Sequence, residues 1–344
     1  MMPRENSISY HFPDSDAGKT LRALPDGAAV EDLGKMLLIR HFETRAEAAY
    51  MQGKVGGFFH AYTGQEAIQT AVTRVFGLEH WYTTTYRCHA LALLLGATPN
   101  EVMAELFGKA TGNAQGRGGS MHLYHDQMLG GFGIVGGHLP VAMGAAFSIQ
   151  YKGEEKLSIC FLGDGAFAQG AVHESLNYAS LWNLPVIVVI ENNQWGMGTD
   201  VGRAICSQPI AEAFAPAYGM RAFTLDGLDY TNCIAGFQEM QKCMQQEKRP
   251  ILVEVVTERF KGHSVSDPGL YRSKEEVRDI VKQDPILRLQ RDLFDAKLLK
   301  EETYKALDEE KKSLVLEALD FAEKSPFPDP AELEEGVLEW ERQT

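Results

Sequence analysis

The chain has 344 residues, of which 44% are hydrophobic and 23% are charged. This length permits one large or two modest domains with a sizeable core, and the composition is ordinary for a soluble protein. The formal net charge of −14, with no basic patch along the sequence, argues against nucleic acid as a partner. A membrane location is also unexpected, because no apolar run reaches the roughly 18–20 residues that a bilayer span needs.

The chain begins with a polar segment. It contains Pro3, Pro13, Asp14 and Asp16 but no apolar stretch, so it predicts a mobile tail rather than a signal peptide. We expect three parts in all, which are a flexible N-terminal tail (1–28), an α/β domain (29–272) and a C-terminal helical extension (273–344) packed on that domain.

The number and spacing of the cysteines indicate the cellular compartment of the protein. The five cysteines are odd in number, and no two are spaced as C-x-x-C. This pattern fits a reducing cytoplasm better than a secreted disulfide framework, and it gives no sign of a zinc site. We therefore predict a cytoplasmic protein.

Helical patterns and loops alternate in the first part of the chain. Leu33, Met36 and Leu37 recur among charged residues, which predicts a helix over 30–52. The further elements predicted here are a glycine-rich loop over 53–64, a helix over 65–75, a β-rich segment over 81–87 and a helix over 90–95. Residues 111–120 contain four glycines and predict a long loop, which is either a surface linker or part of a site.

From residue 156 the pattern changes to short apolar runs separated by helical segments. The predicted strands are 157–162, 186–190, 221–225 and 251–257, with a helix over 167–182 between the first two. Nearly continuous apolar strands separated by helices are typical of a parallel sheet that is buried on both faces. The sequence thus predicts an α/β fold with a mostly parallel sheet and helices on both faces.

The most informative polar residues follow the first two of these strands. Asp164, between Gly163 and Gly165, comes after the first strand, and Asn193 comes after the second. The carboxyl ends of neighbouring parallel strands meet at one edge of the sheet, where ligands bind. A carboxylate and an amide oxygen suit Mg²⁺, and a helix that starts there suits phosphate. Two simple turns would give the same residues without a ligand, but the two apolar strands and their spacing favour a Mg²⁺-diphosphate site.

This arrangement resembles the Gly-Asp-Gly to Asn-Asn motif of thiamine-diphosphate enzymes. Further motifs occur in the same order as in the alpha subunits of thiamine-diphosphate-dependent 2-oxo acid dehydrogenases, and the resemblance to pyruvate dehydrogenase is strongest. These motifs are His60 with Gly64-Gln65-Glu66, 86–89 (YRCH), 116–122 (GRGGSMH), 133–136 (GIVG) and 262–269 (GHSVSDPG). The resemblance covers about residues 30–340, and several motifs in order are far more specific than any one of them.

The resemblance implies a thiamine-diphosphate-binding fold and a role for each matching residue. Mg²⁺ would be held by Asp164, Asn193 and the backbone oxygen of Trp195, where the family usually has tyrosine. The diphosphate would be bound by the backbones of Gly165 and Ala166 and by the side chains of Tyr86, Arg87 and Arg259. The aminopyrimidine ring would be bound by the backbones of Gly133 and Val135.

Two histidines would act at the reacting centre. The resemblance implies that His60 and His263 transfer protons or stabilise charge on the substrate. The alternative for each is a structural histidine whose hydrogen bonds are satisfied within the fold. His263 follows a predicted strand at the cofactor edge of the sheet, which favours the functional interpretation.

The implied reaction is the decarboxylation of pyruvate, followed by transfer of the acetyl group to the lipoyl group of an acyltransferase component. In two-chain members the glutamate that contacts the aminopyrimidine is on the beta subunit, so we expect a beta partner and an alpha-two-beta-two assembly. A branched-chain 2-oxo acid or acetoin is an alternative substrate, and Phe58, Phe59 and Tyr62 would help to decide between them.

A non-catalytic binding subunit and a nicotinamide oxidoreductase are the two alternative functional classes. A non-catalytic binding subunit with the same fold is disfavoured by the intact Asp164, Asn193 and His263. Residues 131–136 (GFGIVG) suggest a nicotinamide oxidoreductase, because they fit the dinucleotide-binding pattern G-x-G-x-x-G. Such a fingerprint follows a strand directly, and residues 125–129 give little strand signal, so we reject a nicotinamide site.

Overall fold

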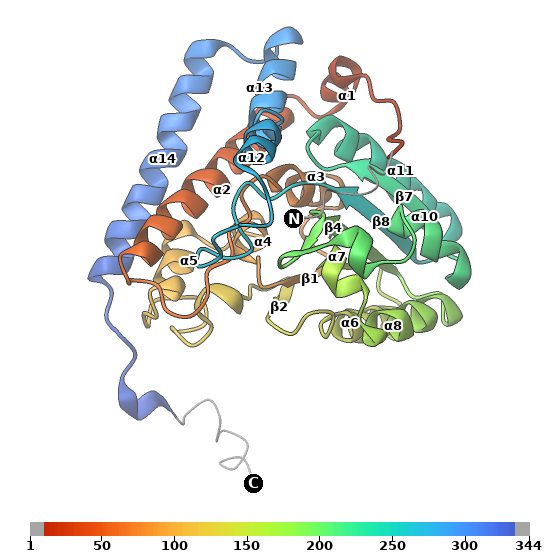
Figure 1. Ribbon diagram of the computed structural model, residues 1–344, viewed down its shortest axis with the longest axis horizontal. Coiled ribbons are helices and arrows are strands. Elements are labelled where there is room, and N and C mark those ends of the chain that lie inside the picture. The colour runs from red at the N-terminus through yellow and green to blue at the C-terminus, as the bar shows by residue number, and fades with distance from the viewer. Residues whose placement is uncertain (1–9, 334–344) are drawn as a thin grey trace.

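Six strands form the central sheet of the protein, and the computed structural model describes residues 10–333 around it (Figure 1). The strand order is β2-β1-β3-β4-β8-β7, and every neighbouring pair is parallel. The strands are β1 (Trp81–Thr85), β2 (Met128–Phe132), β3 (Ser158–Gly163), β4 (Val186–Asn192), β7 (Arg221–Asp226) and β8 (Ile251–Val256). A small antiparallel hairpin consists of β5 (Trp195–Gly196) and β6 (Thr199–Asp200).

Helices cover both faces of this sheet (Figure 1), which confirms the predicted α/β fold class. One face is covered by α2 (Ala28–Met51), α3 (Glu66–Phe76), α4 (His89–Leu94), α5 (Pro99–Leu106), α11 (Tyr230–Glu247), α13 (Pro285–Asp295) and α14 (Glu301–Lys324). The other face is covered by α6 (Leu139–Lys152), α8 (Gly170–Leu181) and α10 (Ile210–Phe214). The shorter elements are η1 (Gly119–Met121), α7 (Asp164–Phe167), α9 (Val201–Ala204), η2 (Ala215–Tyr218), α12 (Lys274–Val281) and η3 (Pro330–Leu333).

The two faces of the sheet bury separate hydrophobic cores. In β3, Ile159 and Phe161 belong to the core beneath α3 and α11, whereas Cys160 and Leu162 belong to the core beneath α6 and α8. Successive side chains of a strand point to opposite faces. A strand with apolar partners on both faces therefore needs a continuous apolar run, which is the pattern found in the sequence.

The strand order creates a crevice at one edge of the sheet. The chain runs from β1 outward to β2 and then returns to β3 on the other side of β1. The connections after β1 and β3 consequently leave the sheet in opposite directions. Open α/β sheets bind ligands at such a point, beyond the carboxyl ends of the strands. The residues that follow β1 and β3 are therefore the first candidates for a site.

Several predicted elements are confirmed, and one expectation was wrong. The helices predicted over 30–52 and 65–75 are α2 and α3, and the four predicted strands are β3, β4, β7 and β8. The segment with little strand signal instead forms the edge strand β2, whose two glycines give it a low intrinsic β-propensity and which forms by pairing with β1. The helix predicted over 167–182 is α8 (Gly170–Leu181), and a separate single turn, α7 (Asp164–Phe167), precedes it.

The terminal segments also differ from expectation in part. Helix α1 (Ala17–Ala23) forms within the predicted tail, where Asp16 caps it by accepting a hydrogen bond from the Lys19 N–H. Leu21 is buried, and Asn232 donates a hydrogen bond to the Pro13 carbonyl, so residues 10–28 are part of the fold. In the predicted C-terminal extension, α14 packs against α2 and α5. Residues 1–9 and 334–344 lie outside the described residues, and the division into three parts stays a prediction. None of the helices described could cross a membrane by its length and apolarity.

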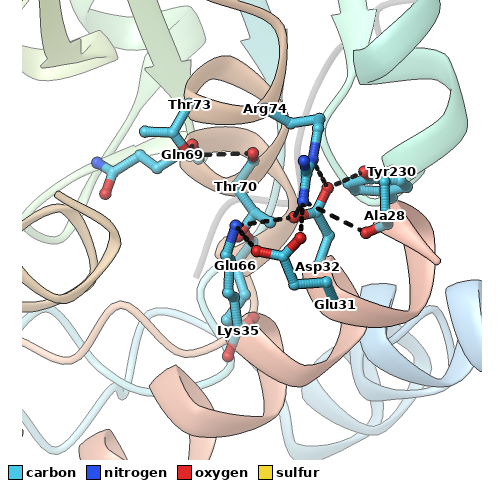
Figure 2. A network of polar contacts seen from close by, with 10 residues as sticks. All are labelled: Ala28, Glu31, Asp32, Lys35, Glu66, Gln69, Thr70, Thr73, Arg74 and Tyr230. Carbon is cyan, nitrogen blue, oxygen red and sulfur yellow. Dashed lines mark hydrogen bonds and ion pairs between the residues drawn. The ribbon is translucent and has the colours of Figure 1, made fainter. Parts of the chain in front are cut away.

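A buried carboxylate joins three helices of the larger core (Figure 2). Asp32 of α2 is fully buried and accepts two hydrogen bonds from Arg74 of α3, at 2.6 and 2.7 Å. It also accepts a hydrogen bond from the Tyr230 hydroxyl of α11. Glu31 is a second partner of the same arginine (2.8 Å), but its side chain is 59% exposed. The network thus contains one buried and one exposed carboxylate on a single guanidinium group.

These two carboxylates give a matched pair of stability predictions. Asp32→Ala leaves Arg74 and Tyr230 without their shared buried partner, so we expect the free energy of unfolding to fall by about 3–5 kcal/mol. Glu31→Ala removes an exposed partner and should lower it by less than about 1 kcal/mol. Denaturant unfolding of the purified variants measures both values. Equal losses would show that burial does not determine the strength of this network.

Candidate cofactor site at the carboxyl edge of the sheet

Two polar residues follow the ends of adjacent strands. β3 ends at Gly163 and β4 at Asn192, and the strands pair in parallel with Gly163 opposite Glu191. Asp164 and Asn193 therefore lie at the same edge of the sheet, and both are buried. The Asn193 N–H hydrogen-bonds to the Glu191 carbonyl at 3.1 Å, and the backbone of Asn193 is close enough to the Asp164 carboxyl group to lower its pKa. The two strand ends thus bring these residues together, as their spacing in the sequence predicts.

Each of these side chains has an oxygen that lacks a partner. Asp164 Oδ2 and Asn193 Oδ1 are buried, and neither has a hydrogen-bond partner among the described residues. Leaving such an atom unpaired costs about 1–3 kcal/mol, and more for a charged group. Burial raises the pKa of Asp164 to about 7, although the positive charge of Arg259 opposes the shift. A cation held between the two oxygens would offset both effects, and oxygen ligands of this kind suit Mg²⁺.

Asp164 and Asn193 line a cavity of about 330 Å³. Nine predicted site residues are in its wall, and these are Tyr86, Arg87, Val135, Asp164, Gly165, Ala166, Asn193, Trp195 and Arg259. The three other predicted residues, His60, Gly133 and His263, are not in the wall. The volume is near the lower end of the range for ligand pockets. The cavity begins beyond β1 and β3, so it occupies the crevice that the strand order creates.

Close backbone packing shapes the floor of the cavity. Gly165 and Ala166 lie in α7, a single turn that begins at Asp164. The N–H groups in a first helical turn have no acceptor within the helix, so both residues could donate to a phosphate. A Cβ atom on Gly165 would lie 2.9 Å from the Cα of Gly196. Glycine at position 165 therefore allows the hairpin β5–β6 to pack directly against this turn.

Two buried arginines supply positive charge to the cavity wall. Arg87 follows β1 and donates to the carbonyls of Ala61 and His263, both at 2.7 Å. Arg259 follows β8 and donates to the Trp195 carbonyl at 3.3 Å and the Tyr271 hydroxyl at 2.8 Å. Burial and then the charge of Arg87 lower the pKa of Arg259. Two guanidinium groups that repel each other in a buried wall favour an anion between them, as a diphosphate would be.

The two predicted catalytic histidines lie side by side next to this wall. The ring centroids of His60 and His263 are 5.0 Å apart, and Tyr86 lies 4.3 Å from the first and 5.7 Å from the second. Tyr86 also lines the cavity, so it connects the histidine pair to the cofactor site.

Both histidines are neutral near pH 7. Burial, and then the charge of Arg87, lower the pKa of His60 to about 3 and that of His263 to about 4. His263 Nδ1 faces the guanidinium nitrogens of Arg259 (3.3 Å) and Arg87 (3.5 Å). Because arginine is only a donor, this Nδ1 is an acceptor. The proton of His263 is therefore on Nε2, which can donate to a substrate oxygen.

Sequence reasoning missed several polar residues of the cavity wall, among them Gln65 and Glu191. Gln65 is part of a motif noted in the sequence, but its contact with Asn193 joins residues far apart in the chain. Glu191 could have been found from strand periodicity, since it lies two residues before Asn193 and shares its side of the strand. Its carboxylate is bound by Tyr62 and Gln69.

We expected Phe58, Phe59 and Tyr62 to help to select the substrate, and the structure supports this for only one of them. Phe59 and Tyr62 are completely buried in the hydrophobic cores. Phe58 is 61% exposed and lies near His60, with ring centroids 6.3 Å apart. Of the three, only Phe58 can therefore contact a substrate directly.

The side chains available at Asp164 and Asn193 indicate which kind of ligand the cavity suits. Among residues 10–333, no three His, Cys, Asp or Glu side chains are grouped so that they could hold a metal. A cation at Asp164 and Asn193 would be only partly coordinated by protein side chains, and Mg²⁺ commonly completes such a shell with phosphate oxygens and water. The fold and the site thus define an α/β protein whose crevice beyond β1 and β3 suits a phosphate-bearing cofactor.

Comparison with known proteins shows the family. The profile of the family described as "Dehydrogenase E1 component" matches residues 34–331. The pyruvate dehydrogenase E1 component subunit alpha of Rickettsia conorii is 40% identical over 306 residues, which are 88% of this chain and 94% of that protein. Proteins of the same name are similar in Rhizobium meliloti (38% over 325 residues, 94% and 93% of the two chains) and Zymomonas mobilis (41% over 309 residues, 88% and 86%).

The chain belongs to the dehydrogenase E1 component family. It is a component of a thiamine-diphosphate-dependent 2-oxo acid dehydrogenase, as its motifs predict. The reason given against a nicotinamide site was wrong, because β2 runs directly into residues 131–136. Membership of this family is the better argument against that site.

The neutral histidines lead to a prediction about pH. The pKa values of His60 and His263 lie below the usual 6.5, so between about pH 4 and 6.5 the unfolded state binds more protons than the folded state. Stability that is present above pH 6.5 is therefore lost as the pH falls through this window. His60→Asn should reduce proton uptake on unfolding at pH 5 by about one proton. Denaturant unfolding between pH 7 and 5 measures this, and an unchanged pH slope would contradict a neutral His60.

Proposed function

We propose that the chain is the alpha subunit of a pyruvate dehydrogenase, which decarboxylates pyruvate and passes the acetyl group to the lipoyl group of an acyltransferase component. The observation that carries the proposal is the pair of partnerless oxygens, Asp164 Oδ2 and Asn193 Oδ1, on a cavity walled by Arg87 and Arg259. The relatives compared above share the name pyruvate dehydrogenase E1 component subunit alpha, which favours pyruvate as substrate.

In this proposal the chain holds thiamine diphosphate through Mg²⁺ and through its own donors. Mg²⁺ would be bound by Asp164, Asn193 and the backbone oxygen of Trp195, which here also accepts a hydrogen bond from Arg259. The diphosphate would be bound by Gly165, Ala166, Tyr86, Arg87 and Arg259, which all line the cavity. Gly133 and Val135 would contact the aminopyrimidine ring through their backbones. Of these two, Val135 lines the cavity, and its side chain is exposed at the rim.

The histidine pair would act on the substrate. When bound, thiamine diphosphate supplies the electron sink that lets the carboxylate of a 2-oxo acid leave as CO₂. His263 is protonated on Nε2 and would donate a hydrogen bond to a substrate oxygen. Because its pKa is about 4, it stabilises negative charge at pH 7 rather than acting as an acid, unless the substrate carboxylate raises its pKa. His60 lies beside it and would share this role.

A beta subunit would complete the site, within an alpha-two-beta-two assembly. The relatives are named as alpha subunits. The loop at the rim of the cavity exposes Ile134 (77%) and Val135 (41%), and exposed apolar side chains of this kind at a site favour a covering partner. We also propose a cytoplasmic location, since all five cysteines are free thiols.

The central experiment uses the chain copurified with its beta subunit. We expect Mg²⁺-dependent binding of thiamine diphosphate and decarboxylation of pyruvate in preference to 3-methyl-2-oxobutanoate. Asp164→Ala removes the carboxylate ligand, so it should abolish cofactor retention even at excess Mg²⁺. Calorimetry and a decarboxylase assay measure these outcomes. Near-normal activity of Asp164→Ala would contradict the metal site, and preference for the branched substrate would favour a branched-chain 2-oxo acid dehydrogenase.

The role of His263 is tested by separating turnover from cofactor affinity. His263→Ala should lower kcat roughly 100-fold or more, while the Kd of thiamine diphosphate stays nearly unchanged. His173→Ala is the control, since His173 of α8 hydrogen-bonds to the Tyr218 hydroxyl of η2 and does not line the cavity; its turnover should be unaffected. A loss of affinity without a loss of turnover in His263→Ala would show that the residue binds cofactor instead.

A further inference from the structure

The tripeptide Gly64-Gln65-Glu66 spans the start of α3, and the proposed function gives it no role. Its outer residues fix its position. A Cβ atom on Gly64 (φ +100°) would lie 2.6 Å from the backbone oxygen of Glu258, so glycine lets the loop approach the segment after β8. Glu66 is fully buried, accepts a hydrogen bond from the Gly64 N–H at 2.9 Å and binds Arg40 of α2 at 2.6 Å. The loop is therefore held from both sides.

Gln65 lies between these two anchors and points at a proposed metal ligand. It is 1% exposed and lines the cofactor cavity. Its Oε1 accepts a hydrogen bond from Nδ2 of Asn193, at 3.2 Å. Its own Nε2 is buried and has no hydrogen-bond partner among the described residues. The contact with Asn193 therefore uses Oε1 of Gln65, and Nε2 of Gln65 remains available to a group in the cavity.

The direction of this hydrogen bond decides which atom of Asn193 can bind a cation. An asparagine amide has one oxygen and one nitrogen at its end, and only the oxygen is a ligand for Mg²⁺. Because Gln65 holds Nδ2, the atom left without a partner is Oδ1. If Gln65 donated to Oδ1 instead, the N–H groups of Asn193 would face Asp164 and repel a cation.

The same face of α3 makes a second, separate contact one turn later. Gln69 donates to Oε1 of Glu191 at 3.1 Å. Glu191 and Asn193 are two residues apart at the end of β4, while Asn192 between them donates to Glu254 at 2.6 Å. Gln65, the N-cap residue of α3, thus contacts Asn193 just after β4, whereas Gln69 within the helix contacts Glu191 of β4. A loss of packing along α3 would affect both contacts, whereas a loss of the metal ligand's orientation would affect only the first.

We propose that Gln65 is a positioning residue that holds the Asn193 amide with its oxygen toward Mg²⁺. It raises the affinity for the metal and, through the metal, for the diphosphate of the cofactor. The proposal rests on the proposed function, since Asn193 is a metal ligand only there. Removing a hydrogen-bond partner of a metal ligand typically weakens metal binding about 10–100-fold.

The test measures Mg²⁺-dependent binding of thiamine diphosphate by calorimetry, without turnover, on the chain copurified with its beta subunit. Gln65→Met keeps the volume and removes the acceptor, so the apparent Kd of Mg²⁺ should rise at least about tenfold. Gln65→Glu keeps an acceptor oxygen and should restore most of the affinity. Gln69→Met is the matched control, which should lower thermal stability but change the Kd of Mg²⁺ less than about twofold.

Two results would overturn the proposal. One is Mg²⁺ binding by Gln65→Met that equals that of the unsubstituted protein. The other is an equal loss in Gln69→Met, which would indicate a general loosening of α3. If Gln65→Met does not assemble, Gln65→Asn withdraws the acceptor by one methylene group and should show the same loss. Failure of the proposed function is distinguishable, because the unsubstituted complex would then show no Mg²⁺-dependent cofactor binding.

Discussion

The partnerless oxygens of Asp164 and Asn193 are the constraint on which the site depends. Parallel pairing of β3 and β4 ends both strands at the same edge, so a carboxylate and an amide oxygen are buried there side by side. Without a ligand this arrangement is unfavourable, and a buried unsatisfied group in a native fold needs an explanation. A ligand that satisfies both oxygens would stabilise the folded state over the unfolded one. Cofactor binding and stability are therefore coupled at this edge.

The rest of the fold holds these two oxygens in place. Because the sheet is buried on both faces, the strand ends cannot shift without disturbing two cores. Helix α3 is fixed near its first residue by Glu66 with Arg40 and near its last turn by Arg74 with Asp32 (Figure 2). Two ion pairs at opposite ends thus set the position of one helix. Gln65 is the N-cap residue of that helix and contacts Asn193, the metal ligand of the proposed function.

The part of the site that could be predicted follows from local patterns. Asp164 and Asn193 each come soon after an apolar run. Where a strand is buried on both faces, the end of its apolar run marks the end of the strand. Edge strand β2 could not be predicted in this way, because its glycines carry no β-propensity and pairing with β1 decides its structure. The contacts of Gln65 with Asn193 and of His60 with His263 join residues far apart in the chain. No period of a helix or strand encodes such contacts, so the histidines were found from family motifs and, for His263, from its place after a predicted strand.

The groups that this chain supplies to the cavity explain why the proposed cofactor site would lie at an interface with a second subunit. Two carboxylates line the cavity, Asp164 and Glu191. In the proposed function the first binds Mg²⁺, and the second is already bound by Tyr62 and Gln69. Arginine does not give up its proton, and the pKa values of His60 and His263 keep both neutral at pH 7. In the proposed function these groups bind and orient the cofactor, and proton exchange with the aminopyrimidine ring would be the role of a carboxylate from a second subunit.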